Sequence, residues 1–253
     1  MFIRLRNNGE VKDRELGLIS HRGGKGFGPE NTLQSLQGAL EYGVEMVETD
    51  VRTSGDGVPL IHHGPFLGLH LLGSTPMSEI RERAPDIPTL QEYLDLAGGR
   101  CSLNLEVKRC DPSRLAEVLD GNEQAPTILV SSFDADFLAM FRQTGSPVEL
   151  GLLSQYEPSA AYLLREAERC GATTLLPVSF RVKGELVEVA HAAGLNVITW
   201  TVNSTGLVEE VVAAGVDGII TDTYPELRDY LESGILDIRR DKVDETGDNG
   251  KQP

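Results

Sequence analysis

The chain has 253 residues, with 23 Lys or Arg against 39 Asp or Glu, so its formal net charge at pH 7 is −16. This acidity disfavours nucleic acid and anionic membrane surfaces as partners. The hydrophobic share of 40% and the charged share of 25% are those of an ordinary globular protein, which excludes a wholly disordered chain. A phosphorylated small molecule stays compatible with the charge if its pocket holds a cation.

Targeting and redox signals are absent from the sequence. The first residues, MFIRLRNNGEVKDREL, lack the apolar core of a signal peptide, and no window approaches the roughly 18 apolar residues of a membrane span. The cysteines, Cys101, Cys110 and Cys170, are odd in number and form no disulfide framework. We expect a cytoplasmic protein without stable membrane insertion, in which Cys101 and Cys170 fill the core.

Short apolar runs typical of strands alternate with helical patterns along almost the whole chain. The predicted strands are Leu16–Ser20, Met46–Val51, Ser102–Lys108, Thr127–Ser131, Val148–Leu153, Thr173–Pro177, Asn196–Val202 and Gly218–Thr221. The helices predicted to follow them are Thr32–Tyr42, Leu90–Ala97, Ser113–Leu119, Ala135–Gln143, Ser159–Cys170, Gly184–Ala193, Leu207–Ala214 and Pro225–Glu232. One further run, Val58–His63, follows an Asp-Gly turn and predicts an antiparallel hairpin with the second strand.

Eight strand–helix units in one domain predict a (β/α)8 barrel over residues 16–235. Residues 1–15 are then an N-terminal extension, and residues 236–253 are a polar tail that we expect to be disordered. A doubly wound open sheet is the alternative. That fold binds nucleotides through glycine motifs, and neither G-x-G-x-x-G nor G-x-x-x-x-G-K-[ST] is present.

In a barrel, function belongs at the carboxyl ends of the strands. Glu48 and Asp50 lie two residues apart on one strand and Glu106 and Lys108 on another, so each pair points to one side. Carboxylates that share a site repel one another unless a positive charge lies between them, and oxygen ligands favour a hard divalent cation such as Mg²⁺, Ca²⁺ or Mn²⁺. The alternative is an ion network in which Glu48 or Asp50 pairs with Arg22 or Lys108.

Two histidines end strands at the same rim. His21 and His63 could flank the acidic group and perform general acid–base chemistry near neutral pH. His62 points to the opposite side of an extended chain from His63. Asn31 reads equally as the N-cap of the first helix and as a member of the site.

The order HRGG, PENT, ETD, HH, LNLEVK, ITWTVN and ITDTYP resembles the glycerophosphodiester phosphodiesterase family from about Gly17 to Tyr230. That family is a (β/α)8 barrel, so the resemblance implies the same fold. By matching motif, it implies two catalytic histidines, three ligands for a divalent Mg²⁺ or Ca²⁺ ion, two phosphate-contacting cations, a supporting PENT element, and a tryptophan lining the substrate end of the pocket. The catalytic histidines would be His21 and His63, and the metal ligands would be Glu48, Asp50 and Glu106. The phosphate-contacting cations would be Arg22 and Lys108. Glu30 and Asn31 belong to the PENT element, and Trp200 is the matching tryptophan.

Two departures bear on specificity. The family usually has His-Asp where this chain has His63-Gly64, and the missing carboxylate could change the orientation of His63. The insert that follows, GPFLGLHLLGSTPMSEI, is shorter and more apolar than the family's usual one. Its leucines could pack on the barrel or contact an acyl chain.

The resemblance implies hydrolysis of a glycerophosphodiester to sn-glycerol 3-phosphate and an alcohol. A lysophospholipase D using the same site is a second reading, and a non-catalytic phosphodiester-binding barrel, motivated by Gly64, is a third. The sequence leaves the alcohol and the oligomeric state open.

Overall fold

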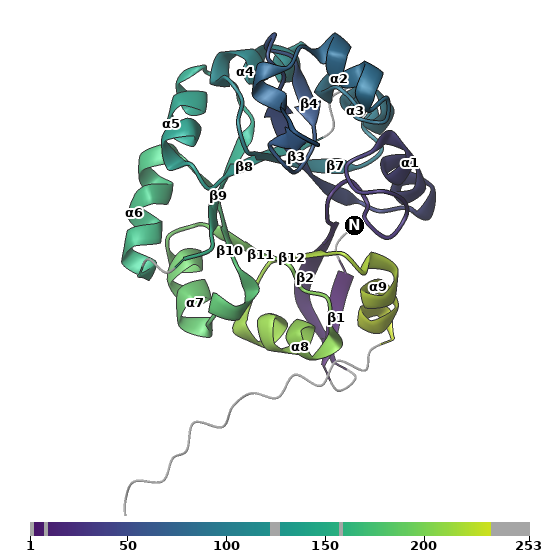
Figure 1. Ribbon diagram of the computed structural model, residues 1–253. Coiled ribbons are helices and arrows are strands. Elements are labelled where there is room, and N and C mark those ends of the chain that lie inside the picture. The colour runs from purple at the N-terminus through teal and green to yellow at the C-terminus, as the bar shows by residue number, and fades with distance from the viewer. Residues whose placement is uncertain (1–2, 8–9, 122–126, 157–158, 234–253) are drawn as a thin grey trace, which may run out of the picture.

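The strands close into a parallel barrel. The computed structural model describes residues 3–7, 10–121, 127–156 and 159–233, with side chains from Leu16 onward. The barrel strands, in spatial order, are β2 (Glu10–Ser20), β12 (Gly218–Thr221), β11 (Asn196–Thr199), β10 (Thr174–Pro177), β9 (Glu149–Ser154), β8 (Ile128–Ser132), β7 (Ser102–Val107) and β3 (Met46–Thr53). Pairing of Ile19 with Met46 closes the ring between β2 and β3 (Figure 1). The predicted barrel is confirmed, and the open sheet is wrong.

Helices surround the strands on the outside (Figure 1). They are α1 (Leu33–Tyr42), α2 (Met77–Arg83), α3 (Leu90–Ala97), α4 (Pro112–Asp120), α5 (Ala135–Gln143), α6 (Ala160–Cys170), α7 (Gly184–Ala192), α8 (Thr205–Ala214) and α9 (Tyr224–Glu232). The main core lies between these helices and the outer face of the strands, and it includes both predicted filler cysteines, Cys101 and Cys170. A smaller cluster of Ile19, Leu153, Leu176 and Ile220, with Trp200 packed against it, fills the inside of the barrel.

The sequence reading missed several short elements. β1 (Ile3–Asn7) pairs antiparallel with β2, which begins at Glu10 rather than Leu16. Between β3 and α3 lie β4 (Pro59–Ile61), β5 (Phe66–Leu67), β6 (His70–Leu71), the 3₁₀ turn Leu72–Ser74 and α2; a second 3₁₀ turn, Ser179–Arg181, precedes α7. Of these, only β4 was predicted, and its antiparallel pairing with β3 is confirmed.

The predicted polar tail, 236–253, lies outside the described residues, and the division into extension, barrel and tail stays a prediction. Among the residues that the structure describes, no helix combines the length and apolarity that crossing a membrane requires.

The first helix begins one residue later than Asn31 would place it. Thr32 is the N-cap: its hydroxyl accepts a hydrogen bond from the Ser35 amide at 3.1 Å, and Ser35 caps Thr32 in return. Asn31 has a φ of +60° and lies in the left-handed region, where it cannot be a normal N-cap residue. Its side chain does not cap the helix and is free to hydrogen-bond with residues of β3.

Candidate active site

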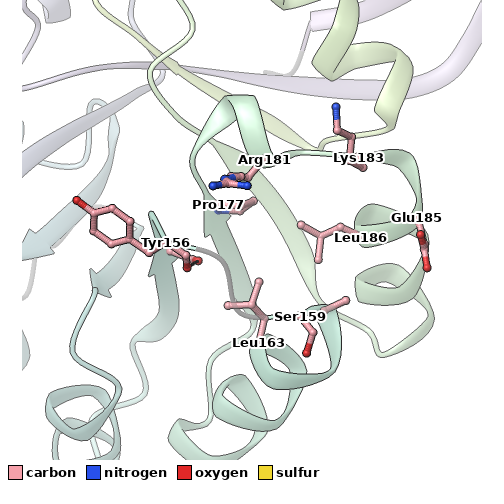
Figure 2. Close-up of a pocket in the computed structure, with 10 residues that line it drawn as sticks. Tyr156, Ser159, Leu163, Pro177, Arg181, Lys183, Glu185 and Leu186 are labelled. Carbon is pink, nitrogen blue, oxygen red and sulfur yellow. Dashed lines mark hydrogen bonds between the residues drawn. The ribbon is translucent and has the colours of Figure 1, made fainter.

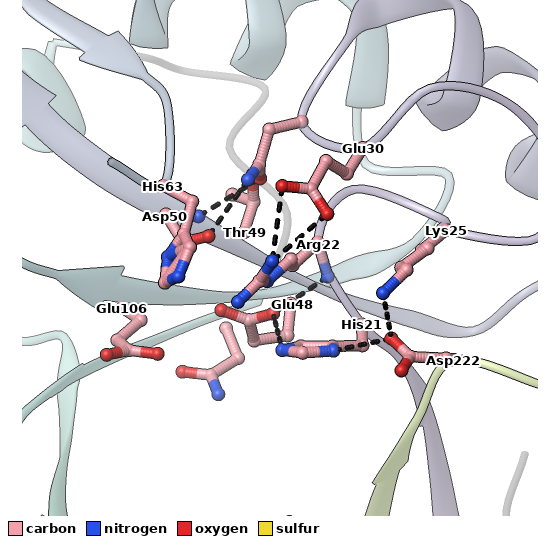
Figure 3. Close-up of polar contacts among 12 residues, drawn as sticks. His21, Arg22, Lys25, Glu30, Glu48, Thr49, Asp50, His63, Glu106 and Asp222 are labelled. Atoms are coloured by element: carbon pink, nitrogen blue, oxygen red, sulfur yellow. Dashed lines mark hydrogen bonds and ion pairs between the residues drawn. The ribbon is translucent and has the colours of Figure 1, made fainter. Parts of the chain in front are cut away.

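Three carboxylates converge at the carboxyl ends of two adjacent strands. Parallel pairing puts Glu48 opposite Asn104 and Asp50 opposite Glu106 on β3 and β7. One oxygen from each of Glu48, Asp50 and Glu106 lies within 4.8 Å of the others. All three side chains are buried. The acidic trio anticipated from the spacing is thus assembled by the register of two strands (Figure 3).

The loop after β2 is shaped to reach this trio. The Arg22 amide donates to Glu48 Oε2 at 2.9 Å, and the Gly23 amide donates to the Glu48 carbonyl at 2.6 Å. Arg22 has a φ of +49°, unusual for a residue with a side chain, so the loop holds a strained backbone at the site. A Cβ on Gly24, at φ +91°, would lie 2.8 Å from the Ser35 carbonyl oxygen, so this position requires glycine.

Asn31 ties the same loop to β3. Its amide Nδ2 donates to Asp50 Oδ2 at 2.8 Å, and its Oδ1 accepts from Thr49 Oγ1 at 2.7 Å. The side chain is buried and joined at both ends, so it fixes the orientation of one carboxylate of the trio. Of the two readings that the sequence left open, the N-cap is wrong, and the contacts place Asn31 against the acidic trio.

The electrostatics of the trio are divided. Burial, and then the negative charges of Asp50 and Glu106, raise the pKa of Glu48 well above its usual value. Burial also raises the pKa of Glu106, against the opposing charge of Lys108. Burial opposes ionisation of Asp50 too, but Lys108, His63 and Asn31 outweigh it and lower its pKa.

Part of the anticipated ion network is present. The Lys108 ammonium pairs with Glu106 and lies 3.2 Å from Asp50 Oδ1. The Arg22 guanidinium pairs instead with Glu30, whose carboxylate oxygens lie 3.0 and 3.1 Å from Nη1. Neither cation pairs with the Glu48 carboxylate. The charge of Lys108 therefore compensates Asp50 and Glu106 but is not paired with Glu48.

The donor set fits a hard divalent cation. Glu48 Oε1 is buried and has no hydrogen-bond partner among the described residues. A buried carboxylate oxygen without a donor is costly, and a cation there would satisfy it. Three carboxylates and no sulfur ligand match the preference of Mg²⁺ or Ca²⁺. Glu48, Asp50 and Glu106 would hold such an ion.

His63 lies beside Asp50. Its Nδ1 is 3.5 Å from Asp50 Oδ1, and burial lowers the pKa of the imidazole. Arg52, on the same side of β3 as Glu48 and Asp50, donates from Nε to the His63 carbonyl at 2.8 Å and holds this segment. His62 turns elsewhere, with Nδ1 2.8 Å from the Gly64 carbonyl oxygen.

Gly64 occupies an open position. A Cβ there would meet only the His62 ring, at 3.6 Å, and the Phe66 carbonyl oxygen, at 3.9 Å, which are ordinary contacts. Backbone geometry therefore does not demand glycine. The backbone at position 64 would accept the aspartate that the family usually has there.

His21 is held by a residue from the far end of the chain. Its Nδ1 lies 2.7 Å from Asp222 Oδ1, just past β12, while its Nε2 lies 3.7 Å from Glu48 Oε2. Asp222 is itself fixed by Asn203 Nδ2 at 2.9 Å, and the hydrogen bond to His21 lowers the pKa of Asp222. Such a carboxylate–histidine pair orients the ring and presents the other nitrogen.

Asp222 and Arg52 were not among the predicted site residues, although signals for both exist. Asp222 directly follows a barrel strand, and Arg52 continues the alternation of Glu48 and Asp50. The predicted residues His21, Arg22, Glu48, Asp50, His63 and Glu106 gather at this rim (Figure 3). Lys108 joins them through its ion pairs with Glu106 and Asp50.

Trp200 joins the site through an aromatic neighbour that the sequence reading did not single out. Its ring meets Phe133 edge-on with centroids 5.7 Å apart, and its Nε1 donates to the Leu176 carbonyl at 2.8 Å. The Lys108 ammonium lies 5.8 Å from the Phe133 ring centre. Phe133 and Trp200 therefore form an aromatic wall next to Lys108.

A second hollow lies on the same face, where β9 and β10 end and α6 and α7 begin (Figure 2). Its volume is about 520 Å³. Apolar Leu163, Pro177 and Leu186 contribute to its wall, and Arg181 and Lys183 supply positive charge. It contains none of the predicted site residues, so the acidic trio remains the candidate centre.

Comparison with known proteins identifies the family to which the chain is similar. The model of the glycerophosphoryl diester phosphodiesterase family matches residues 21–226. A glycerophosphodiester phosphodiesterase of Caldanaerobacter subterraneus subsp. tengcongensis is 28% identical over 240 residues, covering 86% of this chain and 98% of that protein. One of Bacillus altitudinis is 28% identical over 236 residues, covering 83% and 95%.

A solved structure extends the likeness to the fold. A phosphodiesterase of Oleispira antarctica, in complex with the product sn-glycerol-3-phosphate, superposes with a TM-score of 0.75 at 28% identity, covering 85% of this chain and 96% of that one. The family match spans the strand ends that carry the acidic trio and both histidines. The chain therefore belongs to the glycerophosphoryl diester phosphodiesterase family and is an enzyme of that family.

Proposed function

We propose that this enzyme hydrolyses glycerophosphodiesters to sn-glycerol 3-phosphate and an alcohol, with a divalent cation and two histidines. The carrying observation is the buried trio Glu48, Asp50 and Glu106 with His21 beside Glu48 and His63 beside Asp50. The names of the relatives and the product in the Oleispira complex support the substrate class.

Binding of the phosphodiester would rest on positive groups around the trio. When bound, the metal ion supplies positive charge that offsets the negative charge developing on phosphate oxygens. Lys108 provides a second positive centre: its own burial opposes the charged form, but the negative charges of Glu106 and Asp50 outweigh burial and raise the pKa of Lys108. Arg22 Nε, which has no hydrogen-bond partner among the described residues, is a donor left for a phosphate oxygen.

The two histidines would move the protons. One takes the proton from the attacking hydroxyl, and the other gives a proton to the oxygen of the leaving alcohol as its bond to phosphorus breaks. Asp222 positions His21 through Nδ1 and leaves Nε2 facing Glu48. For His63, Arg52 fixes the backbone.

The attacking hydroxyl defines two routes. The glycerol 2-hydroxyl can attack its own phosphate, giving a cyclic phosphate that water then opens, at low entropic cost because the hydroxyl is tethered. Water can also attack directly. A substrate lacking the 2-hydroxyl separates the routes, since turnover of that substrate contradicts the cyclic one.

The decisive assay is release of sn-glycerol 3-phosphate from glycerophosphocholine, first with a chelator and then with Mg²⁺ or Ca²⁺ restored. We expect release to stop with the chelator and to return with a cation. Glu48→Gln should remove the response, whereas Glu149→Gln, an exposed carboxylate at the opposite end of the barrel, should keep it. Full activity in chelator would overturn the metal assignment.

A further inference from the structure

The segment after His63 forms an apolar hairpin at the edge of the site. β5 and β6 pair antiparallel, with Phe66 opposite Leu71 and Leu67 opposite His70. Phe66 is 55% exposed, Leu69 at the turn is 97% exposed, and Leu71 is 39% exposed. Scattered exposed leucines are ordinary, but neighbouring ones on one small element form a patch that marks an interaction site.

The hairpin is anchored rather than loose. On its other side, Leu67 packs on a cluster of Leu60, Leu72, Met77, Ile80 and Ile87. The Leu72 amide donates to the Pro65 carbonyl at 2.9 Å and closes the base. The exposed face is therefore presented by a fixed backbone, so that binding there loses little conformational entropy.

Charge is missing from this part of the chain. From Gly57 to Ser78 the sequence contains no Asp, Glu, Lys or Arg, in a chain of which 25% is charged. The hairpin thus presents neither ion pairs for a charged protein partner nor cations for an anionic membrane. An uncharged hydrocarbon chain is the ligand that its composition matches.

The position of the hairpin indicates where such a chain would come from. Phe66 is three residues from His63, so their Cα atoms lie at most about 11 Å apart. An alkyl group carried by the phosphodiester itself can reach that far once its phosphate lies beside Lys108 and the acidic trio. A bound phosphate would hold the substrate's own alkyl chain close to the hairpin, whereas an unrelated apolar partner would have no such tether.

We propose that Phe66, Leu69 and Leu71 bind the acyl chain of a zwitterionic lysophospholipid whose phosphodiester occupies the site. The proposal rests on the proposed function and narrows its substrate class. It gives the apolar insert a role in selecting single-chain amphiphiles over water-soluble glycerophosphodiesters.

Binding can be tested apart from catalysis. The probe is dodecylphosphocholine below its micelle concentration, titrated by calorimetry into the full chain, with glycerophosphocholine as the tail-less reference. The double variant Phe66→Ser/Leu69→Ser should raise the Kd for the probe about tenfold, equivalent to about 1.4 kcal/mol, without a matching loss for the reference. Met140→Ser, which removes a 50% exposed side chain on α5, is the matched control and should change neither.

Turnover gives the second readout. In the double variant the ratio of kcat/KM for lysophosphatidylcholine to that for glycerophosphocholine should fall about tenfold. An unchanged ratio together with unchanged probe binding would overturn the hairpin proposal while leaving the proposed function intact. Absence of turnover on both substrates would overturn the function, and the calorimetry would still decide the hairpin. Conversion of a wild-type dimer to a monomer by the double variant would instead assign the face to self-association.

Discussion

Replacing Asp222 by Ala tests whether His21 is positioned from the opposite end of the chain. The contact is a 2.7 Å hydrogen bond between a carboxylate and an imidazole whose side chains are only 22% and 15% exposed. Hydrogen bonds to charged groups contribute about 1.5–3 kcal/mol. If that energy holds the ring in the transition state, kcat falls by about 10- to 150-fold, since each 1.36 kcal/mol is a factor of ten.

The assay is steady-state release of sn-glycerol 3-phosphate from glycerophosphocholine, with kcat and KM measured separately. The loss should lie in kcat, because Asp222 contacts His21 and not the cations that we propose bind the phosphate. Lys25→Ala is the matched control: its ammonium reaches the same carboxylate at 3.4 Å but is 41% exposed, so its removal should change kcat less than about fivefold.

Loop distortion is the competing explanation. Asn203 donates to Asp222 Oδ2 and accepts from the Asp222 amide, so Asn203→Ala disturbs the same loop while leaving the His21 contact possible. If Asn203→Ala matched the kcat loss of Asp222→Ala, positioning of His21 would not be its cause. A kcat within twofold of wild type in Asp222→Ala would refute the reasoning outright.

Three further predictions follow from the site and its loops. His21→Ala or His63→Ala should lower kcat by about 10²–10⁴-fold, and near-normal turnover in either variant would remove that residue from acid–base catalysis. The pKa of Glu48 is raised in the folded protein, so its ionisation costs stability as pH rises above about 4.3, its unfolded value. Glu48→Gln should therefore raise the Tm of chelator-treated protein at pH 8, by about 2–4 °C for each kcal/mol of repulsion removed. The variant should also lose the Tm increase that we expect Mg²⁺ to give the wild type. A lower Tm of the variant in chelator would show that ionised Glu48 does not destabilise the fold. Gly24→Ala should destabilise by about 2 kcal/mol or more in urea unfolding, because its Cβ meets backbone, whereas Gly43→Ala at φ +85° in open space should cost about 1 kcal/mol; equal losses would show that strain alone matters.

The barrel could be predicted because most barrel strands contain a short apolar run and a helical pattern recurs between successive strands. β7, Ser102–Val107, shows this well, since its residues from Leu103 to Val107 are buried against helices outside and the lumen inside. The acidic trio could also be predicted, because alternation on a strand fixes the side of Glu48 and Asp50 and parallel register fixes their neighbours.

Other features depend on contacts that local pattern does not encode. α2, Met77–Arg83, is only seven residues long and is stabilised by a satellite cluster with β4 and the insert. Its sequence has too few turns for a periodic signal. β1 was missed although an Asn-Gly pair, Asn8-Gly9, separates it from β2 in the sequence and is a hairpin signal. The Asp222 contact joins residues 201 positions apart, which no local pattern reports.

That separation has a consequence for biosynthesis. Of the strands that the structure describes, β12 is the last to leave the ribosome, yet it pairs with β2, through Gly218 and Gly17, and brings Asp222 to His21. A nascent chain therefore carries its acidic trio and both histidines long before the first histidine is oriented. Closure of the ring, a contact of high sequence separation, is the step that brings Asp222 to His21. Truncated products that stop before β12 lack Asp222 and its contact with His21, so we expect ribosomal errors late in the message to yield inactive chains.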